Sequence, residues 1–404
     1  MLSLTNKQKE YWKNANHRWN IKSGATRSGK TYLDYYMIPR RIREVHGKDG
    51  LVMIIGNTKT TLQRNIVEPL QAVWGASLVS DIKSDNTARM FGEKVHCIGA
   101  DNAARVNQLR GSGIKYCYGD EVVTWHKDVF SMLKSRLDHD YSKFDGTCNP
   151  ENPQHWFKKF MDSGADIFRQ DYTIYDNDFL SPTVVRALEQ EYADSVFFDR
   201  FILGKWTLAE GLIYTQFANN EQAFYIDKED LPSGLTISVG VDIGGNGSNH
   251  AFVATGIDRS ITNVYALKAR SMPAKGTEVE DIVNAFNAFC AEVEAEYGRI
   301  DYAFSDSAEQ AILNTLRAKS KYNVQNSIKN EIIDRIRCES LMLGSGRLHL
   351  VKGQTADLAN GLREAVWDDK KQEDKRLDDG TSDIDIMDAF EYSWEYRIKQ
   401  LIRG

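Results

Sequence analysis

The stretch GATRSGKT at residues 24–31 decides the fold of the first part of the chain. It follows RWNIKSG at 18–24, whose apolar and β-prone residues predict a short strand. It leads into KTYLDYYMIPRRIREV at 30–45, whose aromatic and aliphatic residues recur at helical spacing. Strand, glycine-rich loop and helix in this order are the context that a phosphate-binding loop requires. The alternative is a chance match in a glycine-containing turn.

The residue types in this loop suit a nucleoside triphosphate. Gly24 and Gly29 permit a backbone path that turns N–H groups toward phosphate oxygens. Lys30 supplies a positive charge for the β- and γ-phosphates, and the Thr31 hydroxyl can ligate Mg²⁺. The predicted nucleotide-binding residues of the loop are Gly24, Ala25, Thr26, Arg27, Ser28, Gly29, Lys30 and Thr31.

A phosphate loop of this kind needs a carboxylate at the end of a nearby buried strand. IKYCYGDEVV at 114–123 is an apolar run that closes on two acids. We expect Asp120 to hold Mg²⁺ through water and Glu121 to polarise the attacking water. The alternative is a solvated acidic pair at a strand end.

A further segment, KFDGTCNPENPQHW at 143–156, places Thr147 and Asn149 at the end of another predicted strand, just before Pro150. A Thr/Asn segment at this position can sense the γ-phosphate in helicase-type ATPases, although Asn-Pro is also an ordinary turn. The alternation of strands and helices from residue 18 to about 175 predicts a mainly parallel α/β sheet.

Bulk properties bound the rest of the chain. Its 404 residues exceed the usual size of one hydrophobic core, so two domains are expected. We predict a P-loop ATPase domain over 1–205, a linker over 206–233 and a second domain over 234–404. The net charge of −6 weakens a DNA-binding hypothesis without excluding it, because duplex contacts are local. No apolar run reaches membrane-spanning length, so no membrane association is expected.

Acids recur at strand ends and on a helix in the second half. Residues 235–270 predict three strands, with Asp242 inside the first, and Asp306 ends a later strand. Asp385 and Asp388 stand three apart on a predicted C-terminal helix, hence on one face. Such a cluster repels itself unless a cation neutralises it, and two Mg²⁺ or Mn²⁺ ions would also clamp the oxygens of a phosphodiester during hydrolysis.

Alternatives remain for each acid. Asp242 could bond turn amides, and Asp385 and Asp388 could form an acidic first helical turn, which the helix dipole favours. VGVDIGGNGS at 239–248 also resembles the first phosphate loop of sugar kinases of the actin-like class. That class needs further glycine-rich loops, for which only LGSGR at 343–347 is available. His250 lies near Asp242 in sequence and is left unassigned.

Together these motifs resemble the large terminase subunit of tailed bacteriophages, over nearly the whole chain. The resemblance rests on the P-loop, the strand ending in Asp120-Glu121, the TCNP segment, the GKW…GLIY junction and the three-acid pattern. It implies an RNase H-like nuclease domain with a mixed sheet, C-terminal to the ATPase domain.

The resemblance also implies roles for particular residues. Arg27 would contact the nucleotide, Gln8 would read adenine, and Thr147, Asn149 and Pro150 would couple hydrolysis to movement. A solvated surface role for Gln8 is the alternative. Arg110, or else Arg105, would reach a neighbouring subunit's ATP, unless each is a plain surface arginine. Asp242, Asp306 and Asp388 would bind the nuclease metals, with Asp385 as an auxiliary ligand where many relatives have a histidine.

The function so implied is ATP-driven packaging of double-stranded DNA into a procapsid, with metal-dependent cleavage of concatemers. Its expected partners are the small terminase subunit, the portal protein and further copies in a ring, with a monomer in isolation. The expected location is the host cytoplasm, transiently at the portal and outside the mature virion. The alternatives are a stand-alone helicase or translocase whose second half only binds, and a structural or regulatory nucleotide-binding protein.

Overall fold

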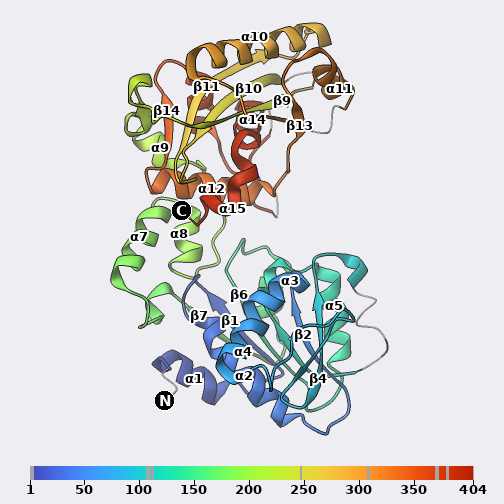
Figure 1. Cartoon of the computed structure of the whole chain (residues 1–404). Coiled ribbons are helices and arrows are strands. Elements are labelled where there is room, and N and C mark those ends of the chain that lie inside the picture. The colour runs from blue at the N-terminus through green and yellow to red at the C-terminus, as the bar shows by residue number, and fades with distance from the viewer. Residues whose placement is uncertain are drawn as a thin grey trace. The chain divides into compact units, whose positions relative to one another are not determined.

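The computed structural model describes residues 4–105, 111, 113–245, 248–306, 310–368, 373–378 and 382–403. The chain divides into two compact units, each with its own sheet (Figure 1). The first unit contains Met1–Val185 and Phe198–Leu208, and the second contains Arg186–Phe197 and Ala209–Gly404. The domain boundaries predicted at residues 205 and 234 stay a prediction. No helix in the described ranges is long and apolar enough to cross a membrane.

The first unit is built on a seven-stranded sheet in the order β3-β4-β2-β5-β6-β1-β7. β3 pairs antiparallel with β4 and every other pair is parallel. The strands are β1 Trp19–Gly24, β2 Leu51–Gly56, β3 Thr87–Met90, β4 Glu93–Gly99, β5 Ile114–Gly119, β6 Lys143–Cys148 and β7 Ile167–Tyr172. Because β5, β6 and β1 are neighbouring parallel strands, the segments that follow them lie close together at the carboxyl ends of these strands.

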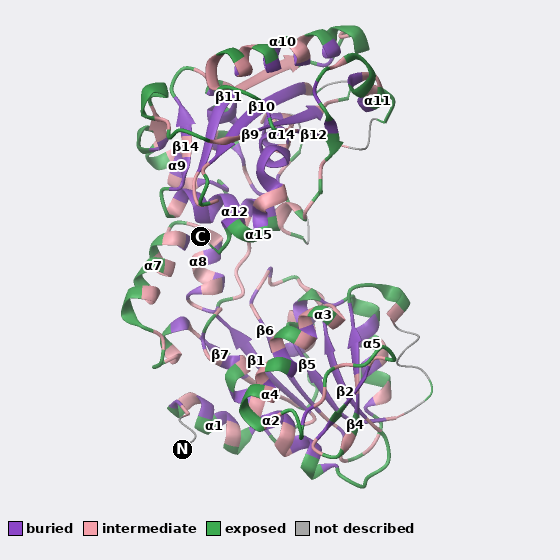
Figure 2. Ribbon diagram, in the orientation of Figure 1, coloured by how far each residue is buried: buried purple, intermediate pink, exposed green. Residues whose placement is uncertain are grey.

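Helices cover both faces of this sheet. Val52 and Ile54 of β2 belong to one hydrophobic cluster and Met53 and Ile55 to another, as expected when successive side chains point to opposite faces. The strands β1, β2 and β5 are accordingly buried along almost their whole length (Figure 2). The helices are α1 Asn6–Asn14, α2 Lys30–Glu44, α3 Lys59–Leu62, α4 Glu68–Trp74, α5 Lys127–Arg136 and α6 Trp156–Met161. Two more, α7 Pro182–Tyr192 and α8 Val196–Phe201, contain residues of both units.

The second unit has a mixed seven-stranded sheet in the order β13-β12-β9-β10-β11-β14-β8. β9, β10 and β11 form an antiparallel meander, and β12 joins β9 in parallel. The strands are β8 Tyr225–Ile226, β9 Thr236–Ile243, β10 Asn249–Ile257, β11 Val264–Pro273, β12 Tyr302–Ser305, β13 Val324–Asn326 and β14 Leu348–Val351. The three strands predicted over 235–270 are therefore confirmed.

Two helices sandwich the meander. Phe286 and Phe289 of α10 pack on Phe252 of β10. On the other face α14 lies directly on β9, where a Cβ added to Gly240 would stand 1.8 Å from the Ala389 carbonyl oxygen. The helices are α9 Thr215–Asn219, α10 Val279–Tyr297, α11 Gln310–Lys319, α12 Ile332–Gly344, α13 Ala356–Glu364, α14 Ile384–Trp394 and α15 Ile398–Leu401. The predicted fold class is confirmed: α/β, with a P-loop NTPase fold on a mainly parallel sheet and an RNase H-like fold on a mixed sheet.

Candidate functional site

The loop between β1 and α2 has the backbone of a phosphate cradle. Its φ angles are positive at Gly24 (148°), Arg27 (54°) and Gly29 (84°), and Gly29 caps α2. These left-handed residues turn the chain sharply between the buried strand and the helix. The N-terminus of α2, which favours anions, therefore faces the cavity that the loop encloses.

Gly24 is required by space as well as by φ. A Cβ at this position would lie 2.0 Å from the carbonyl oxygen of Tyr172 on β7. We expect Gly24→Ala to lower the free energy of unfolding by at least about 2 kcal/mol, because the clash is with backbone. Gly47→Ala is the matched control, since Gly47 also has positive φ (73°) but an added Cβ meets nothing within 4 Å; its cost should stay near about 1 kcal/mol. Equal costs in urea unfolding would contradict this reading.

Lys30 is held inside the loop by backbone oxygens. Its Nζ donates to the carbonyls of Gly24 (2.7 Å) and Ala25 (2.5 Å) and to Oδ1 of Asn149 (3.1 Å). Burial lowers the pKa of Lys30 to about 8. An ammonium so deprived of water gains most from an anionic partner, which is what a polyphosphate would supply.

The two predicted acids, Asp120 and Glu121, follow β5 beside the end of β6. β5 and β6 pair in register at Gly119 and Gly146, so Asp120 and Thr147 end neighbouring strands. The Thr147 hydroxyl donates to Asp120 Oδ1 (3.4 Å) and accepts from the Glu121 amide (3.3 Å). Burial, followed by repulsion from Glu121, raises the pKa of Asp120 to about 7. A divalent cation would favour the ionised form.

Glu121 adopts an uncommon conformation for its residue type, with φ 48°. Such backbone strain costs about 1–3 kcal/mol and clusters at functional sites.

A cavity of about 450 Å³ joins these elements. It is lined by Thr26, Arg27, Ser28, Gly29, Lys30, Thr31, Tyr32, Glu121, Thr147, Cys148, Asn149, Asn177 and Leu180. The cavity therefore collects most of the residues predicted to bind and hydrolyse a nucleotide.

Gln8 contacts the phosphate loop rather than solvent. It is 2% exposed, and its Nε2 donates to the Gly29 carbonyl (2.9 Å) while its Oε1 accepts from the Thr5 amide. The surface alternative for Gln8 is therefore wrong, and its adenine-reading role stays a prediction. Pro150 is buried beside Asn149.

The structure does not decide between the two candidate trans-acting arginines. Arg105 donates to Asp101 (3.0 Å) on an exposed surface, and Arg110 lies outside the described residues. Which of them serves a neighbouring subunit stays a prediction.

The second unit brings the four predicted acids toward one place. Ser305 pairs with Val241, so Asp306 and Asp242 occupy adjacent positions at neighbouring strand ends. Asp385 and Asp388 reach the same region from α14. Burial, and then repulsion from Asp388, Asp385 and Asp306, raises the pKa of Asp242 well above its usual range.

Asp242 and Asp385 have different hydrogen-bond partners. Asp242 bonds the Asp385 side chain, whereas Asp385 is the acid that accepts from a turn amide, that of Asn249 (2.7 Å). Burial raises the pKa of Asp385 as well. The Asp242 and Asp385 carboxyls therefore lie within hydrogen-bonding reach of each other.

Basic side chains cover the other two acids. Lys329 forms an ion pair with Asp306. Arg335 Nη1 and Arg376 Nη2 lie 3.4 Å and 3.2 Å from Asp388 Oδ1. In this arrangement no group of three or more His, Cys, Asp or Glu side chains in the described part of the chain is placed to hold a metal ion.

The donor chemistry nevertheless fits a hard divalent cation. All four candidates are carboxylates, which suit Mg²⁺ and Mn²⁺. Their mutual repulsion shows that the site is short of positive charge at Asp242. We retain Asp242, Asp306, Asp388 and Asp385 as predicted ligands; the arrangement described here is one in which basic side chains occupy part of the site.

The structure shows where His250 points and what conformation residues 343–347 adopt. His250 pairs with Ile243 while Ala251 pairs with Asp242, so His250 points to the sheet face opposite the acids. The segment 343–347 is the turn that ends α12 and leads to β14, with Arg347 bonded to the Leu401 carbonyl. It has no glycine-rich loop-to-helix geometry, so it gives no support to the sugar-kinase alternative.

Sequence reasoning missed the three basic residues of the acid cluster. Lys329 has a positive φ (55°), and its amide donates to buried Glu395 (2.9 Å), but both features are visible only in the structure. Arg376 pairs with Asp388 and with Glu391 (2.7 Å) from a short antiparallel bridge, Trp367 to Arg376. Nothing local in the sequence marks these contacts.

The geometry thus defines a class: a P-loop NTPase fold followed in one chain by an RNase H-like fold with an acidic centre. Residues 21–220 match the family "Terminase large subunit, T4likevirus-type, N-terminal". By its N-terminal half, therefore, the chain belongs to the terminase large subunits.

Known structures extend the likeness over the whole chain. The large terminase of a thermophilic bacteriophage (crystal form 2) superposes with a TM-score of 0.82 at 21% identity, covering 100% of each chain. The ADP complex of that protein gives 0.78 at 21% identity, covering 99% of this chain and 100% of the other. Its ATP-γ-S complex gives 0.77 at 21% identity, covering 97% and 99%. No curated protein sequence matches the chain significantly.

Proposed function

We propose that this protein is a DNA-packaging motor, in which ATP hydrolysis by the first unit drives translocation of double-stranded DNA and the second unit cuts that DNA. The observation that carries the proposal is the cavity in which Lys30, Glu121 and Asn149 converge, in a chain that matches the terminase family and also carries four clustered acids. The large terminase of the thermophilic bacteriophage, of the same fold, binds ADP and ATP-γ-S, which supports ATP as the nucleotide here.

In the first unit, each residue acts by charge or position. The amides of the loop and Lys30 would hold the phosphates, and Thr31 and Asp120 would hold Mg²⁺, which withdraws charge from the phosphates when bound. Glu121 would orient the attacking water. Asn149 bonds Lys30 and Thr147 bonds Asp120, so a change at the γ-phosphate would reach Asn149 and Thr147 of the coupling segment.

Glu121→Gln separates binding from hydrolysis. The substitution keeps the size of the side chain and removes its basicity, so kcat for ATP should fall about 100-fold or more while ATP still binds. Steady-state turnover and equilibrium binding of a fluorescent ATP analogue measure the two effects. Asp128→Asn, on exposed surface a few residues away, is the matched control. Retained turnover in Glu121→Gln would remove Glu121 from the mechanism.

In the second unit, Asp242, Asp306 and Asp388 would hold two Mg²⁺ or Mn²⁺ ions, which polarise the scissile phosphate and activate water when bound. Lys329, Arg335 and Arg376 offset the acids' charge in the arrangement described here. Cleavage so organised depends on phosphate contacts and should show little sequence preference.

The wild-type protein tests the proposal directly. One preparation should hydrolyse ATP faster with duplex DNA present and should nick plasmid DNA with Mn²⁺, and EDTA should abolish both activities. DNA-dependent ATP hydrolysis without any DNA cleavage would favour the translocase alternative. The ion pairs that basic side chains form with Asp306 and Asp388 are consistent with that alternative. Absence of both activities would overturn the proposal in favour of a regulatory nucleotide-binding protein.

The proposal includes the setting in which such a motor works. Small terminase subunit, portal protein and further copies of this chain in a ring would be its partners, with the isolated chain monomeric. Its place would be the host cytoplasm and, transiently, the procapsid portal, outside the mature virion.

A further inference from the structure

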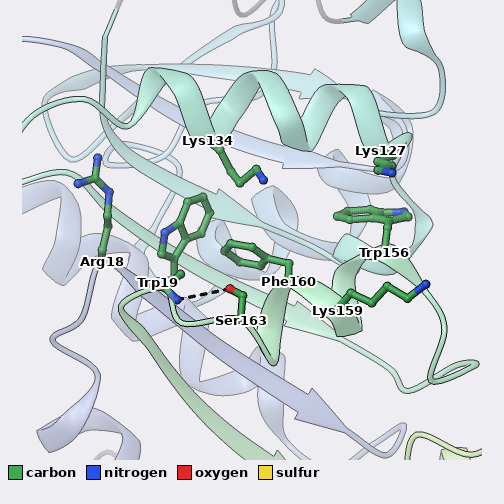
Figure 3. Close-up of a pocket in the computed structure, with 9 residues that line it drawn as sticks. Arg18, Trp19, Lys127, Lys134, Trp156, Lys159, Phe160 and Ser163 are labelled. Atoms are coloured by element: carbon green, nitrogen blue, oxygen red, sulfur yellow. Dashed lines mark hydrogen bonds between the residues drawn. The ribbon is translucent and has the colours of Figure 1, made fainter.

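A second cavity of the first unit, of about 610 Å³, lies between α5 and α6 (Figure 3). We call it the α5–α6 groove. Its lining combines four basic residues, three aromatic rings and two small residues, and contains no acid: Arg18, Lys127, Lys134, Lys159, Trp19, Trp156, Phe160, Ser163 and Ala165. None of these residues takes part in the nucleotide cavity.

Among the described residues, the lysines of the groove lack acidic partners, whereas the charge of Arg18 lies near Asp166. No ion pair joins Arg18, Lys127, Lys134 or Lys159 to an acid in the part of the chain that the structure describes. The acids at its rim are engaged elsewhere. Asp162 pairs with Lys158 and Arg169. Asp166 bonds His17 and the backbone amide of Arg18. The groove is thus a local positive site on a chain of net charge −6.

The aromatic rings form the floor between these cations. Trp156 lies below Lys127, and Phe160 lies in the middle, where Lys134 points toward it (Figure 3). The Lys134 Nζ stands 5.5 Å from the Phe160 ring centre. Lys127 and Lys134 are seven residues apart on α5, two turns or about 10.5 Å along one face. The apolar rings therefore lie beside positive charge from α5, and Lys159 adds positive charge from α6.

We propose that the α5–α6 groove binds single-stranded nucleic acid, with bases against Trp156 and Phe160 and phosphates against Lys127, Lys134, Lys159 and Arg18. A chain of nucleotides offers flat rings and one charge per residue in alternation, which is the pattern of the groove. A duplex keeps its rings stacked inside and presents none to a recessed floor. An acidic peptide would satisfy the lysines but supplies flat rings only where its sequence happens to place them.

The two helices that form the walls of the groove follow directly after the segments that contain Glu121 and Asn149. α5 begins at Lys127, a few residues after Glu121, and α6 begins at Trp156, a few residues after Asn149. A nucleic-acid strand bound in the groove would therefore contact α5 and α6, the two helices that follow the loops lining the nucleotide cavity. The inference itself concerns binding alone and does not depend on the proposed ATPase or nuclease reactions.

Fluorescence anisotropy tests the proposal with full-length protein, a labelled oligo(dT) of about 16 nucleotides, and EDTA to prevent cleavage. Binding should weaken about 50-fold between 50 and 200 mM salt if four phosphates are engaged. Lys134→Ala with Lys159→Ala should weaken it at least about 10-fold and make the salt slope shallower. Trp156→Ala should weaken it at least about 5-fold.

The control variant removes the same charge from the same unit. Lys48 lies over the Tyr141 ring and Lys205 pairs with Asp199, both outside the groove lining, so Lys48→Ala with Lys205→Ala should leave oligo(dT) affinity within about 2-fold. Circular dichroism and binding of the ATP analogue confirm folding of each variant. The proposal is overturned if oligo(dT) does not bind, if the control weakens binding as much as the groove variant does, or if blunt duplex or poly-glutamate is the ligand that depends on the groove.

Discussion

Lys30→Met is expected to lower kcat for ATP hydrolysis about 100-fold or more and to weaken ATP binding. The Lys30 ammonium lies among the carbonyls of Gly24 and Ala25, inside the cavity that the loop encloses. Among the described residues that line this cavity it is the one buried cation, since the other positively charged residue, Arg27, is exposed. Removing a fixed charge from a water-poor site costs more than removing one from a surface, because the loop cannot replace it.

The fold should survive this substitution. Burial lowers the pKa of Lys30 to about 8, so it already disfavours the charged form, and methionine has similar length without a charge to desolvate. We expect the urea midpoint of Lys30→Met to equal or exceed that of the parent, with turnover lost. Lys48→Met, outside the cavity, should change neither quantity. Full ATP turnover by Lys30→Met would remove the P-loop from the mechanism, whereas loss of both turnover and stability would leave only a structural role for Lys30.

Sequence alone predicted the parts of both sites that depend on local geometry. A glycine at positive φ, a lysine at the first position of a helix and an acid at the end of an apolar strand are readable because strand and helix periods fix where side chains point. Gly24, Lys30 and Asp120 were predicted for this reason, and Asp242 was predicted as an acid inside an apolar strand. The order of the strands was not predicted, because the neighbourhood of β5, β6 and β1 depends on which hydrophobic faces pack together.

The basic residues of the second unit could not be found in this way. Lys329 reaches Asp306, and Arg335 and Arg376 reach Asp388, from a loop, a helix and a short bridge that are brought together only by tertiary packing. Each is an ordinary charged residue in its own segment. The same holds for Gln8, whose burial against Gly29 depends on how α1 packs on the loop. Ion pairs between distant segments therefore mark the limit of what pattern reasoning recovers here.

Asp242→Asn is expected to reduce Mn²⁺-dependent plasmid cleavage about 100-fold or more. Asp242 is the most buried of the four acids and is repelled by the other three, so it is the position at which a metal ion would relieve the largest electrostatic cost. Asparagine has the same shape but lacks the negative charge that holds a divalent ion. Affinity for Mn²⁺, followed by calorimetry, should fall together with cleavage.

The stability of Asp242→Asn distinguishes a metal site from a structural acid. A carboxyl whose pKa is raised by burial and like charges opposes folding as pH rises, so replacing it with a neutral amide should hold or raise the melting temperature without metal at pH 7–8. An acid that stabilised the fold through its charge would show the reverse. Asp227→Asn is the control, since Asp227 makes only an exposed ion pair with Lys352. If Asp242→Asn cleaves DNA as fast as the parent while Asp227→Asn behaves identically, the acids of this sheet edge do not form the nuclease centre.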